Sequence, residues 1–135
     1  MSKIIYTNSD GTVSIIHPTG DVNDAIKDVP TGLSYEIVDD SVISSDRTFR
    51  NAWVKGSGVI TEDVTKSKVL AHGIRRGKRV AEFKPHDDTI SLNIPGTDTS
   101  AAETARAAIR TKYATMQTNI DNATNIAGIE TALGG

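Results

Sequence analysis

The sequence of 135 residues contains no cysteine, few aromatic residues and no long apolar run. Without cysteine, neither a disulfide framework nor a thiolate metal site can form. Because only 4% of the residues are aromatic, the core must come mainly from valine, isoleucine, leucine and alanine. No apolar stretch approaches the roughly 18 residues of a membrane-spanning helix or follows Met1 as a signal peptide would. We therefore expect one small domain, or a domain with an appendage, that contacts no membrane.

Charge is distributed unevenly along the chain, although its net value is only −2. Residues 1–46 carry eight acidic and two basic side chains, whereas residues 47–84 carry ten basic and three acidic ones. Residues 85–135 are acidic again, with six acidic and three basic side chains. The basic middle can pair with acidic segments of this chain or of a neighbour, which explains it at least as well as nucleic acid does.

The first sixty residues show the two-residue period and the turn signals of β-strands. Asn8-Ser9-Asp10-Gly11 predicts the turn of a hairpin. Asp21 is expected to cap a short helix that follows it. The expected strands lie at residues 3–7, 12–17 and 34–38. Residues 53–60 are expected to form either a further hairpin or a strand that leads to a loop.

From Thr61 onward the apolar residues recur with a period of about 3.6, which predicts helices. The first helix should end or kink at Pro85, because proline lacks an N–H group and clashes with the preceding turn. Its apolar stripe is expected at Val69, Leu70, Ile74 and Val80. Residues 86–96 are expected to form a loop.

Ser100-Ala101-Ala102-Glu103 has the pattern of a capping box and predicts the start of a second helix. A last short helix is expected over residues 126–133. These elements predict an α+β fold, with a small antiparallel β-rich N-terminal part at residues 1–60 and a helical C-terminal part at residues 61–135. The apolar face of the second helix is expected at Ala102, Ala105, Ile109, Tyr113, Met116 and Ile120.

No residue pattern in the chain predicts an active site. His86-Asp87-Asp88 offers three potential metal ligands, but neighbours in sequence seldom converge on one ion, so we favour an exposed loop. Gly56-Ser57-Gly58 lacks the lysine and the following helix of a phosphate-binding loop, so we favour a turn. We expect a non-enzymatic protein with no catalytic residue, no metal and no cofactor.

Four cations lie close together at Arg75, Arg76, Lys78 and Arg79. They could neutralise the phosphates of a nucleic acid, but no aromatic residues are interleaved for base stacking and no reader motif surrounds them. We favour a surface that docks acidic protein and expect no specific nucleic-acid partner.

The segment from Arg47 to Trp53 holds the only tryptophan, one of two phenylalanines and two arginines. Tryptophan and arginine are common at interface hot spots, but a chain with few aromatics also needs its large rings in the core. We predict a division of roles. Phe49 and Trp53 should form a structural aromatic cluster, while Arg47 and Arg50 should contact a partner.

Several segments resemble a family of short proteins encoded near tail-fibre genes in tailed bacteriophages and prophages. The segment Asp46-Arg47-Thr48-Phe49-Arg50-Asn51-Ala52-Trp53 carries the most specific part of this resemblance. Gly73, Gly77 and Pro85 stand where family members usually have an unbroken helix. The other similar segments are residues 4–18, residues 27–39, residues 63–68, Ile74-Arg75-Arg76 and residues 126–130.

The resemblance implies a tail-related protein that acts by protein–protein contacts. A tail-fibre assembly chaperone or tail accessory protein is the first expectation, and a permanent structural component of the virion is the alternative. Other tail or tail-fibre proteins would then be the partners, with a homo-oligomer left open. The protein would be found in the virion or in the host cytoplasm during assembly. The resemblance transfers no catalytic or ligand-binding residues.

Overall fold

In the computed structural model, which describes residues 1–134, the chain forms two units. The first unit, Met1–Ser67, contains all five strands found among these residues, and the second, from Lys68 onward, is helical. The predicted α+β class, with antiparallel strands first and helices after them, is confirmed. The helical part begins at Val64, a few residues after the expected boundary at residues 60 and 61.

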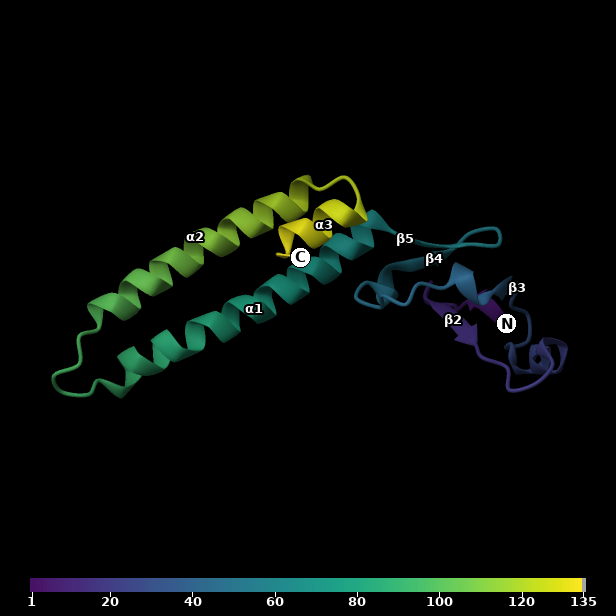
Figure 1. The fold of residues 1–135 in the computed structure, drawn as a ribbon, viewed down its shortest axis with the longest axis horizontal. Coiled ribbons are helices and arrows are strands. Elements are labelled where there is room, and N and C mark those ends of the chain that lie inside the picture. Colours follow the sequence, from purple (N-terminus) through teal and green to yellow (C-terminus); the bar gives the residue numbers. More distant parts are fainter. Residues whose placement is uncertain (135) are drawn as a thin grey trace. The chain divides into compact units, whose positions relative to one another are not determined.

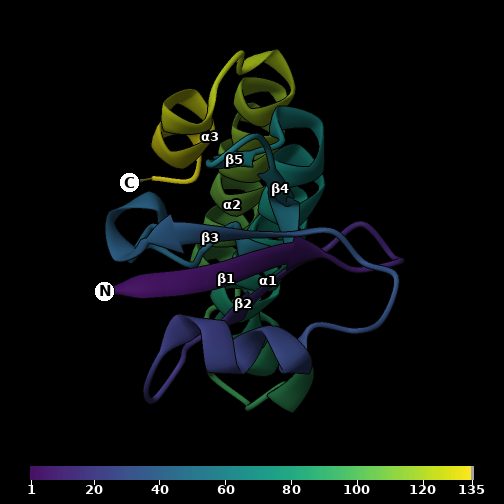
Figure 2. The same ribbon diagram turned by 90° about the vertical axis from the view of Figure 1, so that its right-hand side faces the viewer.

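A three-stranded antiparallel sheet forms the centre of the first unit (Figure 2). Strand β1 (Ser2–Thr7) lies between β2 (Val13–Ile16) and β3 (Tyr35–Asp39). In the turn between β1 and β2, Gly11 has a φ of 87°, a conformation that favours glycine. The three strands and the first hairpin are therefore where the two-residue period and the turn residues predicted them.

Both faces of β1 are covered, since Ile4 and Ile5 point to opposite sides and each is fully buried. The 3-10 helix η1 (Val22–Asp28) lies against the sheet (Figure 2) and buries Ala25. The Asp21 carboxylate accepts a hydrogen bond from the Asn23 N–H at 2.8 Å, as expected for a cap.

A second hairpin pairs β4 (Trp53–Lys55) with β5 (Ile60–Glu62), which is the first of the two structures expected for this segment. Its turn is tied to β3, because the Glu36 carboxylate accepts a hydrogen bond from the Gly58 N–H at 2.9 Å. Phe49 and Trp53 are each 1% exposed, so both rings lie in the core of this unit. The short 3-10 helices are η2 (Asp40–Val42) and η3 (Arg50–Ala52).

Helix α1 continues through Pro85 over Val64–Leu92, so the expected end of the helix at Pro85 and the expected loop from residue 86 to Leu92 are wrong. The reason lies in tertiary contacts around Pro85. On one side of Pro85, Glu82 pairs with Lys112, and on the other Asp87 pairs with Arg106. Both partners belong to the next helix, so an ion pair on each side of Pro85 supports the helix where local sequence disfavours it.

Helix α1 also starts three residues later than expected, and α2 (Ser100–Asn122) is capped by a different residue. The Asp63 carboxylate accepts a hydrogen bond from the Lys66 N–H at 2.8 Å, as an N-terminal cap does. Before α2, the Asp98 carboxylate accepts from the Ser100 N–H at 2.9 Å. The proposed capping box is therefore wrong, because Ser100 is already the first helical residue and Asp98 satisfies its N–H group.

Helices α1 and α2 form an antiparallel hairpin, with the short helix α3 (Ile126–Ala132) folded back beside it (Figure 1). The predicted apolar face of α2 is confirmed at five of its six positions, whereas Ala105 is only partly buried. The predicted stripe of α1 is wrong in part, because Val69 and Val80 are 66% and 67% exposed. Ala71 and Arg75 are buried instead.

No helix formed by residues 1–134 is long and apolar enough to cross a membrane.

Trp53→Ala should destabilise the first unit by about 3–5 kcal/mol, because it leaves a cavity where a fully buried ring was. Val54→Ala, at a neighbouring side chain that is 37% exposed, is the control and should change the free energy of unfolding by less than about 1 kcal/mol. Denaturant unfolding of both variants measures the difference. Equal effects would show that Trp53 does not support the core.

Gly77→Ala should stabilise the protein by about 1 kcal/mol, because glycine costs that much inside a helix relative to alanine. A methyl group at this position meets no atom within 4 Å, so nothing in its surroundings opposes the gain. Gly11→Ala is the matched control and should destabilise, since the φ of 87° strains any residue with a side chain. Thermal unfolding of the two variants should show shifts of opposite sign.

Candidate functional site

Four arginines line one groove between α1 and α2. They are Arg75, Arg76 and Arg79 from α1 and Arg110 from α2. The groove has a volume of about 420 Å³, and its other lining residues are Val80, Tyr113, Ala114 and Gln117. None of these residues is acidic. We call this concavity the arginine groove.

None of the four arginines has a carboxylate within 4.0 Å among residues 1–134. The nearby carboxylates are used elsewhere, with Glu82 at 2.6 Å from Lys112 and Asp87 at 2.9 Å from Arg106. Cations gathered in a concavity repel one another and lose part of their hydration. The groove therefore favours an anionic ligand, because none of its lining residues carries a carboxylate.

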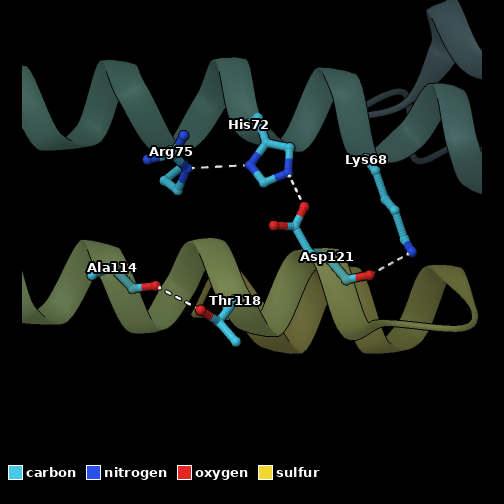
Figure 3. A network of polar contacts seen from close by, with 6 residues as sticks. All are labelled: Lys68, His72, Arg75, Ala114, Thr118 and Asp121. Atoms are coloured by element: carbon cyan, nitrogen blue, oxygen red, sulfur yellow. Dashed lines mark hydrogen bonds and ion pairs between the residues drawn. The ribbon is translucent and has the colours of Figure 1, made fainter.

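Arg75 is only 9% exposed, and a chain of polar contacts holds its guanidinium group (Figure 3). Its Nε donates a hydrogen bond to His72 Nδ1 at 3.2 Å, and His72 Nε2 lies 2.8 Å from Asp121 Oδ1. Because an arginine Nε always carries hydrogen, Nδ1 must be the acceptor, and the imidazole hydrogen lies on Nε2, toward Asp121. The terminal nitrogens of Arg75 form no hydrogen bond with residues 1–134, so they are available for a ligand.

Lys68 strengthens the same contact between the helices, since its Nζ donates a hydrogen bond to the Asp121 carbonyl oxygen at 2.9 Å (Figure 3). The start of α1 is thus joined to the end of α2 through both the backbone and the side chain of Asp121. This anchoring fixes the hairpin register and, with it, the position of Arg75 relative to Arg110.

Arg79 is held by an aromatic ring rather than by an acid. Its guanidinium carbon lies 4.8 Å from the centre of the Phe83 ring, and that of Arg106 lies 5.9 Å from the same ring. A guanidinium over an aromatic face is attracted by the ring and loses conformational freedom. Arg75 and Arg79 are therefore both restrained before any ligand arrives, which lowers the entropic cost of binding.

Glu82 is close to Tyr113 but is not among the residues that line the groove. A hydrogen bond from Lys112 is the main cause that lowers the pKa of Glu82, followed by one from Tyr113. Burial, followed by the hydrogen bond to Glu82, raises the pKa of Tyr113. Glu82 therefore stays ionised, yet its charge is compensated by Lys112 and does not neutralise the groove.

The structure brings together three of the four cations of the predicted basic cluster. Lys78 is not among the groove residues, and its Nζ instead donates a hydrogen bond to the Leu133 carbonyl oxygen at 3.0 Å. Arg47 and Arg50 belong to the first unit and are exposed, and neither forms an ion pair within the described chain. Arg47 lies over the Trp53 ring, 6.0 Å from its centre.

Four residues of the site were not predicted from the sequence, and they are His72, Phe83, Arg110 and Asp121. His72, Arg110 and Asp121 contribute because α1 pairs with α2. Phe83 lies on α1, one turn after Arg79. The antiparallel register would have revealed them, because it places the end of one helix beside the start of the other. That register could not be derived while α1 was expected to stop at Pro85.

The three potential metal ligands at His86, Asp87 and Asp88 do not converge. Asp87 pairs with Arg106, and Asp88 accepts a hydrogen bond from Lys84 at 2.8 Å. Across residues 1–134, no group of three or more metal-ligating side chains is close enough to hold an ion. This segment is also helical rather than an exposed loop.

Comparisons with protein-family models, with curated proteins and with solved structures find no match to this chain. A functional proposal must therefore rest on the residues, their geometry and the sequence resemblance.

Acidification below about pH 4.5, the ordinary pKa of glutamate, should destabilise the fold. Hydrogen bonds donated to several carboxylates lower their pKa in the folded state, so the unfolded chain binds protons first and stability falls with the pH. Thermal unfolding between neutral and acidic pH should show a progressive decrease. The carboxyl groups concerned are Asp10, Glu36, Asp39, Asp46, Glu82 and Asp98.

Glu82→Gln provides the control for this pH dependence. The variant should be less stable at neutral pH and should lose less stability on acidification, because one of the titrating groups is gone. A variant whose stability falls as steeply as that of the wild type would show that the pair of Glu82 and Lys112 does not contribute to the effect.

Proposed function

We propose that this protein acts through protein–protein contacts and binds carboxylates of a partner protein in the arginine groove. The observation that carries the proposal is the gathering of four guanidinium groups around one concavity of about 420 Å³ that contains no acidic side chain. Arginine forms planar, bidentate ion pairs with carboxylates and is enriched at the hot spots of protein interfaces.

The apolar part of the groove favours protein over a bare ion as the ligand. Val80, Ala114 and the ring of Tyr113 line the concavity beside the arginines. An acidic peptide presents both carboxylates and aliphatic groups, so it would contact both kinds of lining residue. Nucleic acid would find the charges but few rings for its bases to stack on, and its binding would depend steeply on salt.

For the biological setting, we propose a tail-related role in a tailed bacteriophage, supported by the resemblance of residues 46–53 and of the neighbouring segments. A tail-fibre assembly chaperone or tail accessory protein would use the groove to hold an acidic region of a fibre protein until assembly is complete. The alternative is a permanent component of tail fibre, baseplate or head–tail junction.

Mass spectrometry of purified virions separates these two roles. An assembly chaperone should be absent or present below one copy per fibre, since it leaves when assembly is complete. A structural component should be present in a copy number that matches the symmetry of its neighbours. Absence of any effect on tail or fibre assembly when the gene is deleted would contradict both roles.

Binding of a fluorescent poly-glutamate peptide at about 150 mM salt, the physiological level, tests the groove itself. Arg76→Glu combined with Arg79→Glu should weaken this binding by at least about tenfold, or 1.4 kcal/mol. Lys84→Glu, on the same helix but outside the arginine groove, is the control for a change of charge and should bind normally.

Duplex DNA serves as the competing probe. Its binding should appear only at low salt and without sequence preference. If duplex DNA binds more tightly than poly-glutamate at physiological salt, and groove substitutions abolish that binding, the proposed protein ligand is wrong.

A further inference from the structure

The two units carry charge of opposite sign. Met1–Ser67 has ten acidic and six basic side chains, a net charge of −4, whereas the unit from Lys68 onward has seven acidic and nine basic ones, a net charge of +2. Opposite charge on separate units of one chain allows one copy to attract another. This attraction between copies is strongest where charged side chains of each unit have no partner within the chain.

In the first unit, exposed carboxylates without a partner gather on η1. Asp24 and Asp28 are exposed, and neither side chain forms a hydrogen bond or an ion pair with any residue of the described chain. Both line the same surface hollow, together with Asp21. Unlike these two, Asp21 accepts hydrogen bonds from Asn23 as the cap of η1, and Lys27 lines the same hollow.

Three other carboxylates of the first unit are engaged in ion pairs. Asp39 and Asp40 lie within 4.0 Å of the N-terminal ammonium group, and Asp40 also pairs with Lys3 at 3.3 Å. Glu36 pairs with Lys55 at 3.3 Å. The η1 carboxylates Asp24 and Asp28, which form neither a hydrogen bond nor an ion pair within the described chain, are free to meet cations from outside.

We propose that the arginine groove of one copy binds the η1 carboxylates Asp24 and Asp28 of a second copy. This inference rests on the proposed function, because it names the partner of the same groove. The groove supplies four guanidinium groups, two of them restrained in advance by His72 and Phe83, and η1 supplies the anions that the groove lacks. The contact satisfies charges on both copies.

The two surfaces differ, so the contact joins unlike patches of identical chains. After the first contact forms, one copy still has a free η1 and the other still has a free groove. Such a heterologous contact propagates into an open row, or into a ring if the rotation between copies closes. Lys27 on η1 is exposed and opposes the contact by like-charge repulsion, which keeps the association reversible and sensitive to salt.

Sedimentation equilibrium of the full chain tests this assembly with two neutralised variants. Asp24→Asn with Asp28→Asn removes the η1 carboxylates, and Arg76→Gln with Arg79→Gln removes two exposed or partly exposed groove cations while leaving buried Arg75 in place. The wild type should form species larger than a dimer as its concentration rises and should dissociate in high salt. Each variant alone should remain monomeric.

An equal mixture of the two variants is the decisive sample. One variant retains only the groove and the other only η1, so the mixture should form dimers and nothing larger. Lys27→Glu should strengthen association of the otherwise unchanged chain by about tenfold, since it replaces repulsion with attraction. Lys84→Gln with Asp88→Asn, an ion pair outside both surfaces, is the control and should associate as the wild type does.

A wild type that stays monomeric at every concentration and salt level would overturn the inference, as would a mixture that stays monomeric. Species larger than dimers in the mixture would also overturn it, because they require a different contact. If the wild type is monomeric but its groove still binds poly-glutamate, self-assembly fails while the proposed function survives. If neither association nor poly-glutamate binding occurs, both fail.

Discussion

The contact from Asp121 through His72 to Arg75 is the interaction on which the helical unit and its site depend. It places a guanidinium group between two helices, where a cation costs free energy unless polar groups surround it. His72 accepts from Arg75 Nε at 3.2 Å and meets Asp121 at 2.8 Å, so one face of the guanidinium is satisfied internally. The other nitrogens are left for a ligand. The same contact fixes the register of the hairpin, which brings Arg110 beside the arginines of α1.

Local sequence predicted the strands well and one helix poorly, for a physical reason. Strands β1 and β2 are joined by a short turn, so the two-residue period and Gly11 are sufficient to define the hairpin. The helical conformation around Pro85 depends instead on residues about twenty to thirty positions away. Glu82 and Asp87 bind Lys112 and Arg106 of α2, and no local pattern reveals those bonds. The expected capping box before α2 is also wrong, because Thr99 is the N-cap and the Asp98 carboxylate accepts a hydrogen bond from the Ser100 N–H group.

The candidate site was predictable in composition but not in arrangement. The basic cluster stands out in the sequence, yet only the hairpin register shows that Lys78 turns to the Leu133 carbonyl oxygen while Arg110 joins the groove. The aromatic residues were easier, because a chain with so few large rings buries them, and Phe49 and Trp53 are each 1% exposed. Arg47 and Arg50 are exposed, and their contact with a partner stays a prediction.

The account's central claim is that the η1 carboxylates of a second copy occupy the arginine groove. Side-chain Nε–H signals in nuclear magnetic resonance spectra, recorded as the protein is concentrated at low salt, test it most directly. The account predicts that the signals of Arg76, Arg79 and Arg110 shift together, that the carboxyl signals of Asp24 and Asp28 shift with them, and that salt reverses the change. Groove signals that stay constant while the protein associates, or shifts confined to Arg47 and Arg50, would contradict it.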